Sequence, residues 1–143
     1  MTLEEKDLLL RDLCARLPYG VFCNIGLDKP SLLQSLFVDK LDGILLDFYK
    51  DGKDYQVYLS EVKPYLIPLS SMTEEQKEEL KQEHIKDEKL YAECLTMAAK
   101  GDSSMRGKVI IHYAMDWCNK NHFDFRGLIP LGLAIDATGL NIY

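Results

Sequence analysis

The stretch Met105–Asn121, MRGKVIIHYAMDWCNKN, constrains the fold of this chain more than any other. Apolar residues recur in it at helical spacing and cover most of the helix circumference, leaving one narrow polar strip. The apolar rows are Val109, Ile110, Tyr113 and Trp117, and beside them Ile111, Met115 and Cys118. A helix of this kind is normally buried among other elements. We therefore expect it to be the central element of the core, with Trp117 and Cys118 away from water.

Length and composition limit the class of protein. The chain has 143 residues, 47% hydrophobic and 28% charged, which suits a single globular domain over residues 1–143 that folds without disulfides or metal. No apolar run approaches the roughly 20 residues needed to cross a bilayer, so no membrane partner is expected. The first residues, MTLEEKDLLLRD, carry too many charges for a signal peptide, which favours a cytoplasmic protein.

The cysteines and the net charge exclude further classes. No CxxC pair is present, so neither a zinc knuckle nor a thioredoxin-type site is predicted, and no cofactor is expected. The four cysteines, expected to be buried, reduced thiols in apolar patterns, are Cys14, Cys23, Cys94 and Cys118. The net charge of −6 is unfavourable for binding nucleic acid, which needs clustered Lys and Arg.

The N-terminal segment predicts a helix over residues 3–16. Thr2 and Glu5 have the spacing of a capping box, in which each side chain accepts a hydrogen bond from the other residue's backbone. Pro18 should end the helix near Arg16. The row expected to face the core is Leu3, Leu10, Leu13, Cys14 and Leu17.

Four candidate strands follow, joined by turns such as Asp42-Gly43 and Asp51-Gly52. Alternating apolar and polar residues mark the strands Tyr19–Ile25, Leu33–Asp39, Ile44–Tyr49 and Tyr55–Ser60. In the second strand, the alternation sets Leu33 and Phe37 on one face, opposite Leu36 and Val38. Short connections imply antiparallel neighbours, so these strands predict a three- or four-stranded meander.

The middle of the chain predicts a crossing segment and then helical structure. Residues 61–71 contain two prolines among apolar residues, which predicts a helical turn followed by a buried extended crossing. Thr73 and Gln76 form a second capping box. The charged segment that follows, residues 74–100, is either one helix or two.

The C-terminal segment predicts a short helix and a hairpin. Asp124 is expected to be the N-cap of the helix, with Phe123 and Leu128 in the hydrophobic staple positions. Residues 133–136 and 140–143 should pair across a small turn. The predicted fold is therefore α+β, with a three- to four-stranded antiparallel meander packed against three or four helices and a short C-terminal hairpin.

Four residues are the candidates for chemistry. His112 and Asp116 lie four apart on one side of the long helix, and His122 and Asp124 follow closely, so together they could bind a metal or act as an acid–base pair. Their spacing matches no zinc signature. The simpler interpretation, which we favour, is that His112 and Asp116 bond each other and Asp124 caps the next helix. No catalytic, cofactor-binding or metal-binding residue is assigned.

Aromatic residues on the predicted sheet provide the best candidates for a partner surface. Tyr49, Tyr55 and Tyr58 occur in the last two strands and could form an exposed aromatic patch. Such patches are typical of protein–protein interfaces.

Four segments carry a resemblance to a known group of proteins. They are Leu10–Val21 (LRDLCARLPYGV), Leu41–Tyr49 (LDGILLDFY), Pro64–Glu75 (PYLIPLSSMTEE) and Asn121–Ala134 (NHFDFRGLIPLGLA). They resemble uncharacterised small proteins of gut Bacteroidetes and their prophage-like mobile elements. The resemblance implies a short cytoplasmic protein carried on mobile DNA, and it implies no activity and no site residues.

Three functions are compatible with these features. The leading one is a non-enzymatic accessory or protein-interaction protein of a phage or mobile element, because no catalytic constellation is recognised. The alternative is a small hydrolase or metal-dependent enzyme that uses the four His and Asp residues above. A third is an acidic mimic of nucleic acid, which would use the carboxylates of Glu74–Glu93.

Overall fold

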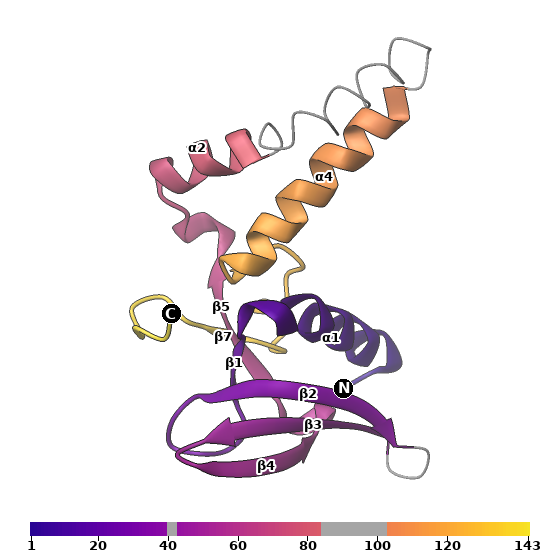
Figure 1. The fold of residues 1–143 in the computed structure, drawn as a ribbon, viewed down its shortest axis with the longest axis vertical. Coiled ribbons are helices and arrows are strands. Elements are labelled where there is room, and N and C mark those ends of the chain that lie inside the picture. Colours follow the sequence, from indigo (N-terminus) through magenta and orange to yellow (C-terminus); the bar gives the residue numbers. More distant parts are fainter. Residues whose placement is uncertain (40–42, 84–102) are drawn as a thin grey trace.

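The computed structural model describes residues 1–39, 43–83 and 103–143 (Figure 1). Three α-helices lie within these residues: α1 (Leu3–Arg16), α2 (Glu74–Glu83) and α4 (Ser103–Lys120). The strands are β1 (Phe22–Asn24), β2 (Ser31–Asp39), β3 (Gly43–Lys50), β4 (Lys53–Tyr58), β5 (Lys63–Pro68), β6 (Phe123–Asp124) and β7 (Ile135–Asp136). In these residues, no helix is long and apolar enough to span a membrane.

The strands form one seven-stranded mixed sheet. Its order is β4-β3-β2-β1-β5-β6, and β7 also pairs with β5. Strands β1 to β4 are the antiparallel meander that the turns predict, but β5 joins β1 antiparallel, and β6 and β7 join β5 in parallel. The prediction of a three- to four-stranded meander with a C-terminal hairpin is therefore wrong. Because β5 contains two prolines, its residues were predicted to be an extended crossing and not a strand of the sheet. Strands β6 and β7 have only two residues each, and they form by pairing with β5.

Helix α1 covers one face of the meander. It begins at the predicted capping box, with Glu5 N donating to Thr2 Oγ1 (3.1 Å) and Thr2 N donating to Glu5 Oε2 (2.6 Å). The predicted inward row is confirmed for Leu13, which is buried, and for Leu10 and Leu17, which pack partly buried against the core. It is wrong for the other two members, Leu3 and Cys14, which are exposed. The side chains that α1 buries are Leu9, Asp12, Leu13 and Arg16. A prediction from hydrophobicity alone does not identify the buried face of α1, because two of these four buried residues, Asp12 and Arg16, are charged.

The main core lies between α1 and the sheet. Leu9 and Leu13 pack there with residues of the sheet, such as Leu33, Leu46 and Phe48. Figure 1 shows α1 beside the sheet, whereas α2 and α4 lead away from β2, β3 and β4. The helix predicted over Met105–Asn121 is therefore not the centre of the main core.

Helix α4 contributes to a second, smaller cluster. Trp117 and Cys118 are buried as predicted, with 4% and 5% of their surface exposed, and Trp117 stacks on Phe123 at 5.5 Å between ring centroids. Two and five residues before Trp117, however, Met115 and His112 are exposed. The predicted apolar rows before residue 112 lie outside the side chains that the structure describes.

A β-bulge in β2 exchanges the faces of this strand. Leu33 pairs with Phe48, but Ser35 pairs with Asp47, so Gln34 is an extra residue. An extra residue shifts the alternation by one position. Leu33 and Leu36 therefore both face the core and Phe37 faces the other way. The predicted pairing of Leu33 with Phe37 on one face is wrong for this reason.

Helix α2 begins at the second predicted capping box. Thr73 N donates to Gln76 Oε1 (2.9 Å), and Gln76 N donates to Thr73 Oγ1 (3.2 Å). Lys77 pairs with Glu74 on its surface. Whether residues 74–100 form one helix or two concerns residues 84–102, which lie outside the described part of the chain.

The C-terminal segment has no helix after α4 and no hairpin. Phe123 and Asp124 form β6, and the chain then turns, with Leu133 N donating to Leu128 O (3.0 Å). Residues 140–143 form no strand, and the Tyr143 hydroxyl instead donates to Tyr65 O on β5 (2.7 Å). The predicted short helix and hairpin are both wrong, because pairing with β5 replaces local pairing.

Candidate functional site

The first two candidate residues, His112 and Asp116, do not form the predicted pair with each other. Asp116 accepts a hydrogen bond from the hydroxyl of Tyr19, at 2.6 Å. His112 is exposed on α4 and its ring meets the edge of Tyr113. The Asp116 carboxylate therefore connects α4 to the 3-10 turn Leu17–Tyr19 that follows α1.

His122 is buried at the turn after α4. Its backbone is left-handed, with φ of 60°, and its ring stacks on Tyr143 with ring centroids 3.6 Å apart. Burial, and then the charge of Arg16, lower its pKa to about 4. The imidazole is therefore neutral at physiological pH, and its Nδ1 is buried without a hydrogen-bond partner among the described residues.

Asp124 organises the chain turn that follows it. Its two carboxylate oxygens accept from the backbone N–H groups of Leu128 and Ile129, both at 2.8 Å. The capping role predicted for this residue is thus fulfilled for a turn and not for a helix. Because both of its oxygens accept these hydrogen bonds, the Asp124 side chain stabilises the turn.

The four candidates consequently do not assemble into a reactive centre. In the part of the chain that the structure describes, no group of three or more His, Cys, Asp or Glu side chains could hold a metal ion. Each residue instead has its own separate environment.

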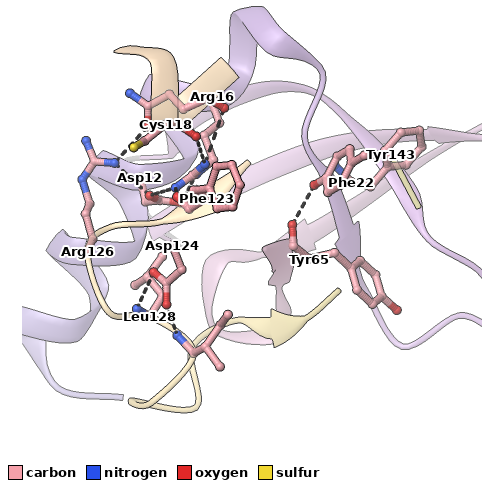
Figure 2. Close-up of polar contacts among 12 residues, drawn as sticks. Asp12, Arg16, Phe22, Tyr65, Cys118, Phe123, Asp124, Arg126, Leu128 and Tyr143 are labelled. Carbon is pink, nitrogen blue, oxygen red and sulfur yellow. Dashed lines mark hydrogen bonds and ion pairs between the residues drawn. The ribbon is translucent and has the colours of Figure 1, made fainter. Parts of the chain in front are cut away.

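A buried ionic cluster that the sequence did not reveal is formed by two side chains of α1, Asp12 and Arg16, together with Arg126 (Figure 2). Asp12 and Arg16 are completely buried. Arg16 Nε donates to Asp12 Oδ2 (2.7 Å), and Arg16 Nη2 donates to Asp12 Oδ1 (3.0 Å). Arg126 Nη1 donates to the same Oδ1 at 2.9 Å. Figure 2 shows both guanidinium groups directed toward Asp12. A carboxylate bonded to two guanidinium groups in this way makes burial of the charges tolerable.

Arg16 also bonds the backbone of the C-terminal half. It donates to Phe123 O (2.8 Å) and to Cys118 O (3.3 Å) at the end of α4. A cation is favourable at a helix C-terminus, where the last carbonyl groups lack helical partners. The cluster therefore joins α1 to α4 and β6. The i,i+4 spacing of Asp12 and Arg16 was the one signal in the sequence that could have indicated it.

The cysteines do not provide an activated nucleophile. Cys23 and Cys118 are buried as predicted, whereas Cys14 is exposed, which contradicts the prediction for that residue. Burial is the largest effect on all three thiols and raises their pKa values. A raised pKa disfavours the thiolate, which is the reactive form. Cys94 lies outside the described residues.

A cavity of about 490 Å³ lies between the end of β5, the start of α2 and the C-terminus. Its lining is Ile67, Ser71, Thr73, Gln76, Phe123, Ala137, Thr138, Gly139, Asn141, Ile142 and Tyr143. The side chains of these residues include hydroxyl and amide groups but no carboxylate, imidazole, amine or thiol. The cavity therefore lacks a base or a metal ligand among its lining residues.

The face of β2, β3 and β4 that points away from α1 is the most distinctive surface. We call it the outer sheet face. Register places three rows across it, and from one end to the other they are Phe37–Leu45–Tyr58, Ser35–Asp47–Gln56 and Leu32–Tyr49–Asp54. Phe37, Tyr58 and Tyr49 are 39%, 41% and 49% exposed. Two of the three tyrosines proposed from the sequence therefore share a face, whereas Tyr55 packs against the core on the opposite side.

The middle row of the outer sheet face is polar and ordered. Ser35 Oγ donates to Asp47 Oδ2 at 2.7 Å, and Gln56 Nε2 donates to Asp47 Oδ1 at 2.9 Å. Both donors are neutral. The surface thus presents a fixed carboxylate at Asp47, between the apolar residues Leu45 and Tyr49 of β3.

Comparisons of the chain with protein-family models, with curated proteins and with solved structures find no match.

Proposed function

We propose that this protein acts by binding another protein through the outer sheet face, as a non-enzymatic accessory protein. The observation that carries the proposal is the exposure of Phe37, Tyr49 and Tyr58 on one face of an ordered sheet. Aromatic side chains are enriched in protein interfaces because they bury much apolar area and lose little conformational freedom.

The position of these residues on a sheet supports the proposal. Strands β2, β3 and β4 are paired along most of their length, and the core holds their other face. A surface that is already ordered loses less conformational entropy when it binds a partner. The outer sheet face would therefore bind without rearrangement of its backbone.

We further propose a cytoplasmic location and an origin in a phage or mobile element. Cys14, Cys23 and Cys118 are free thiols, which is usual in a reducing compartment. The origin is supported by the resemblance of the four sequence segments quoted above.

Site-specific photo-crosslinking in cells that naturally carry the gene tests the proposed surface. A photoreactive phenylalanine analogue is placed at position 49 or 58, and in a matched control at Met115. Met115 is 38% exposed on α4, which leads away from the outer sheet face (Figure 1). We expect both sheet positions to capture the same partner and the control to capture none of it.

A Phe37→Ser variant completes the design, because it removes apolar area from the same face without carrying the crosslinker. It should reduce capture at position 58 while the thermal unfolding midpoint stays close to that of the parent protein. Equal capture at all three crosslinker positions would contradict the proposal.

A further inference from the structure

The outer sheet face has an unbalanced negative charge at its centre. Asp47 is held by Ser35 and Gln56, which are both neutral. Among the described residues, the ion pairs involve other carboxylates, and no Lys or Arg pairs with Asp47. An ionised carboxylate accepts about four hydrogen bonds, so Asp47 retains capacity for a further donor.

Apolar residues flank this charge along β3. Leu45 and Tyr49 lie two residues before and after Asp47 on the same face. Alternate residues of a strand are separated by about 6.8 Å. The face thus presents an apolar, an anionic and an apolar position in a line about 13 to 14 Å long.

We infer that the outer sheet face binds a cationic amphipathic helix, in which one Arg or Lys lies between two apolar residues. Residues i, i+4 and i+8 of a helix lie on one side and are about 6 Å apart along the axis, which is close to the spacing of the three rows. The basic residue would reach Asp47, and the apolar residues would cover the rows of Tyr58 and Tyr49. This inference rests on the proposed function, because it names the partner of that same surface.

Charge and hydrogen bonding favour this occupant over two others. A second copy of the chain related by a two-fold axis through the middle row would bring Asp47 against Asp47, and this like-charge contact is unfavourable. A single extended segment lying on the face would leave its backbone groups unpaired at the interface, whereas a helix satisfies its own. A helix with a central cation avoids both problems.

The test is selection from a displayed library of random 16-residue peptides against the whole protein. Selected peptides are then compared on three variants. Asp47→Asn removes the charge but keeps the shape and can still bond Ser35 and Gln56. Asp54→Asn is the matched control, because it removes a carboxylate from the same face at a position that Ser35 and Gln56 do not hold. The third variant, Tyr49→Ser/Tyr58→Ser, removes the aromatic area.

The inference predicts selected sequences with a basic residue and apolar residues four positions to either side. Asp47→Asn should weaken their binding about tenfold, and Asp54→Asn should change it less than about twofold. A peptide with Gln in place of the basic residue should no longer distinguish the parent protein from Asp47→Asn.

Other outcomes would overturn the inference and separate it from the proposed function. Peptides that lose binding on the double tyrosine variant but show no basic preference, or that repeat with a period of two, would overturn the inference and leave the proposed function standing. If sedimentation shows that the parent protein is a dimer and the Tyr58→Ser variant is not, the face binds a second copy of the chain, and the inference is overturned as well. Peptides that bind all three variants equally would count against both.

Discussion

Asp12 and Asp47 are each held by the side chains of two other residues, but they lie in opposite environments. Asp12 is completely buried between the guanidinium groups of Arg16 and Arg126. Asp47 lies on the outer sheet face and is held by an alcohol and an amide. In the first case the partners neutralise the carboxylate inside the fold. In the second they orient the carboxylate and leave its charge available to a partner.

This difference indicates which polar clusters of the molecule are structural and which could recognise a partner. A buried charge must be neutralised within the chain, because the interior does not solvate it. A surface charge has no such requirement, so fixing it in place without neutralising it suits recognition. The predictions below test this distinction, beginning with the largest expected effect.

The same substitution at the two positions should have very different effects on stability. Asp12→Asn leaves two buried or partly buried guanidinium groups without their anion and should lower the free energy of unfolding by about 3–5 kcal/mol. Asp47→Asn should change it by less than about 0.5 kcal/mol. Urea unfolding followed by circular dichroism measures both. Similar losses in the two variants would remove the distinction between the clusters.

Asp124 provides a second comparison of buried and exposed carboxylates. Asp124→Ala removes the acceptor of two backbone N–H groups and should lower the free energy of unfolding by about 2–3 kcal/mol. Asp116→Ala removes one exposed hydrogen bond, from Tyr19, and should cost less than about 1 kcal/mol. The same urea titrations measure both. A larger effect at Asp116 would show that the α1–α4 contact is the stronger constraint.

His122 should make the buried region, and not the outer sheet face, sensitive to pH. Its pKa is lowered from 6.5 to about 4 in the folded protein, so the unfolded state binds the proton first as the pH falls. This contribution to stability is complete above pH 6.5 and is lost between about 6.5 and 4, with a loss on the order of 2 kcal/mol. His122→Asn, which tolerates the left-handed backbone, should remove this part of the pH dependence in urea titrations. If the free energy of unfolding depends on pH in the same way in the variant and the parent protein, the conclusion that His122 is neutral in the folded protein is wrong.

The smallest effects on stability are expected on the outer sheet face. Tyr49→Ser and Tyr58→Ser each remove an exposed ring and should change the free energy of unfolding by less than about 1 kcal/mol. Both should nevertheless reduce partner capture by a crosslinker placed at the other tyrosine. A loss above about 3 kcal/mol would mean that these rings belong to the core of the fold.

The local features of the fold could be predicted because neighbouring residues determine them. The capping boxes at Thr2 and Thr73 are present as expected. Asp51 and Gly52 adopt positive φ values of 49° and 80°, as a two-residue hairpin turn requires. In each case the interacting atoms are within a few residues of one another, so the pattern of side chains is sufficient.

The candidate surface could be predicted only in part. Tyr49 and Tyr58 were recognised from the alternation in their strands, but Tyr55 lies on the other face. Phe37 was assigned to the wrong face because the bulge at Gln34 carries no signal in the residue pattern. The hydrogen bonds that hold Asp47 were not predicted either, since its two donors come from neighbouring strands that pair only in the folded sheet.

The sequence by itself determined where α1 and α2 begin, that the chain turns at Asp51-Gly52 and that Trp117 is buried, because these depend on contacts within a few residues or on strong apolar character. Only the tertiary structure decided that β5 gathers β6 and β7, that α1 buries Asp12 and Arg16, and which side of β2 carries Phe37. The first two outcomes depend on residues more than 50 and more than 100 positions apart, and the third depends on how β2 pairs with β3 across the bulge. Their energies exist only when the distant partner is in place, so no local pattern could have revealed them.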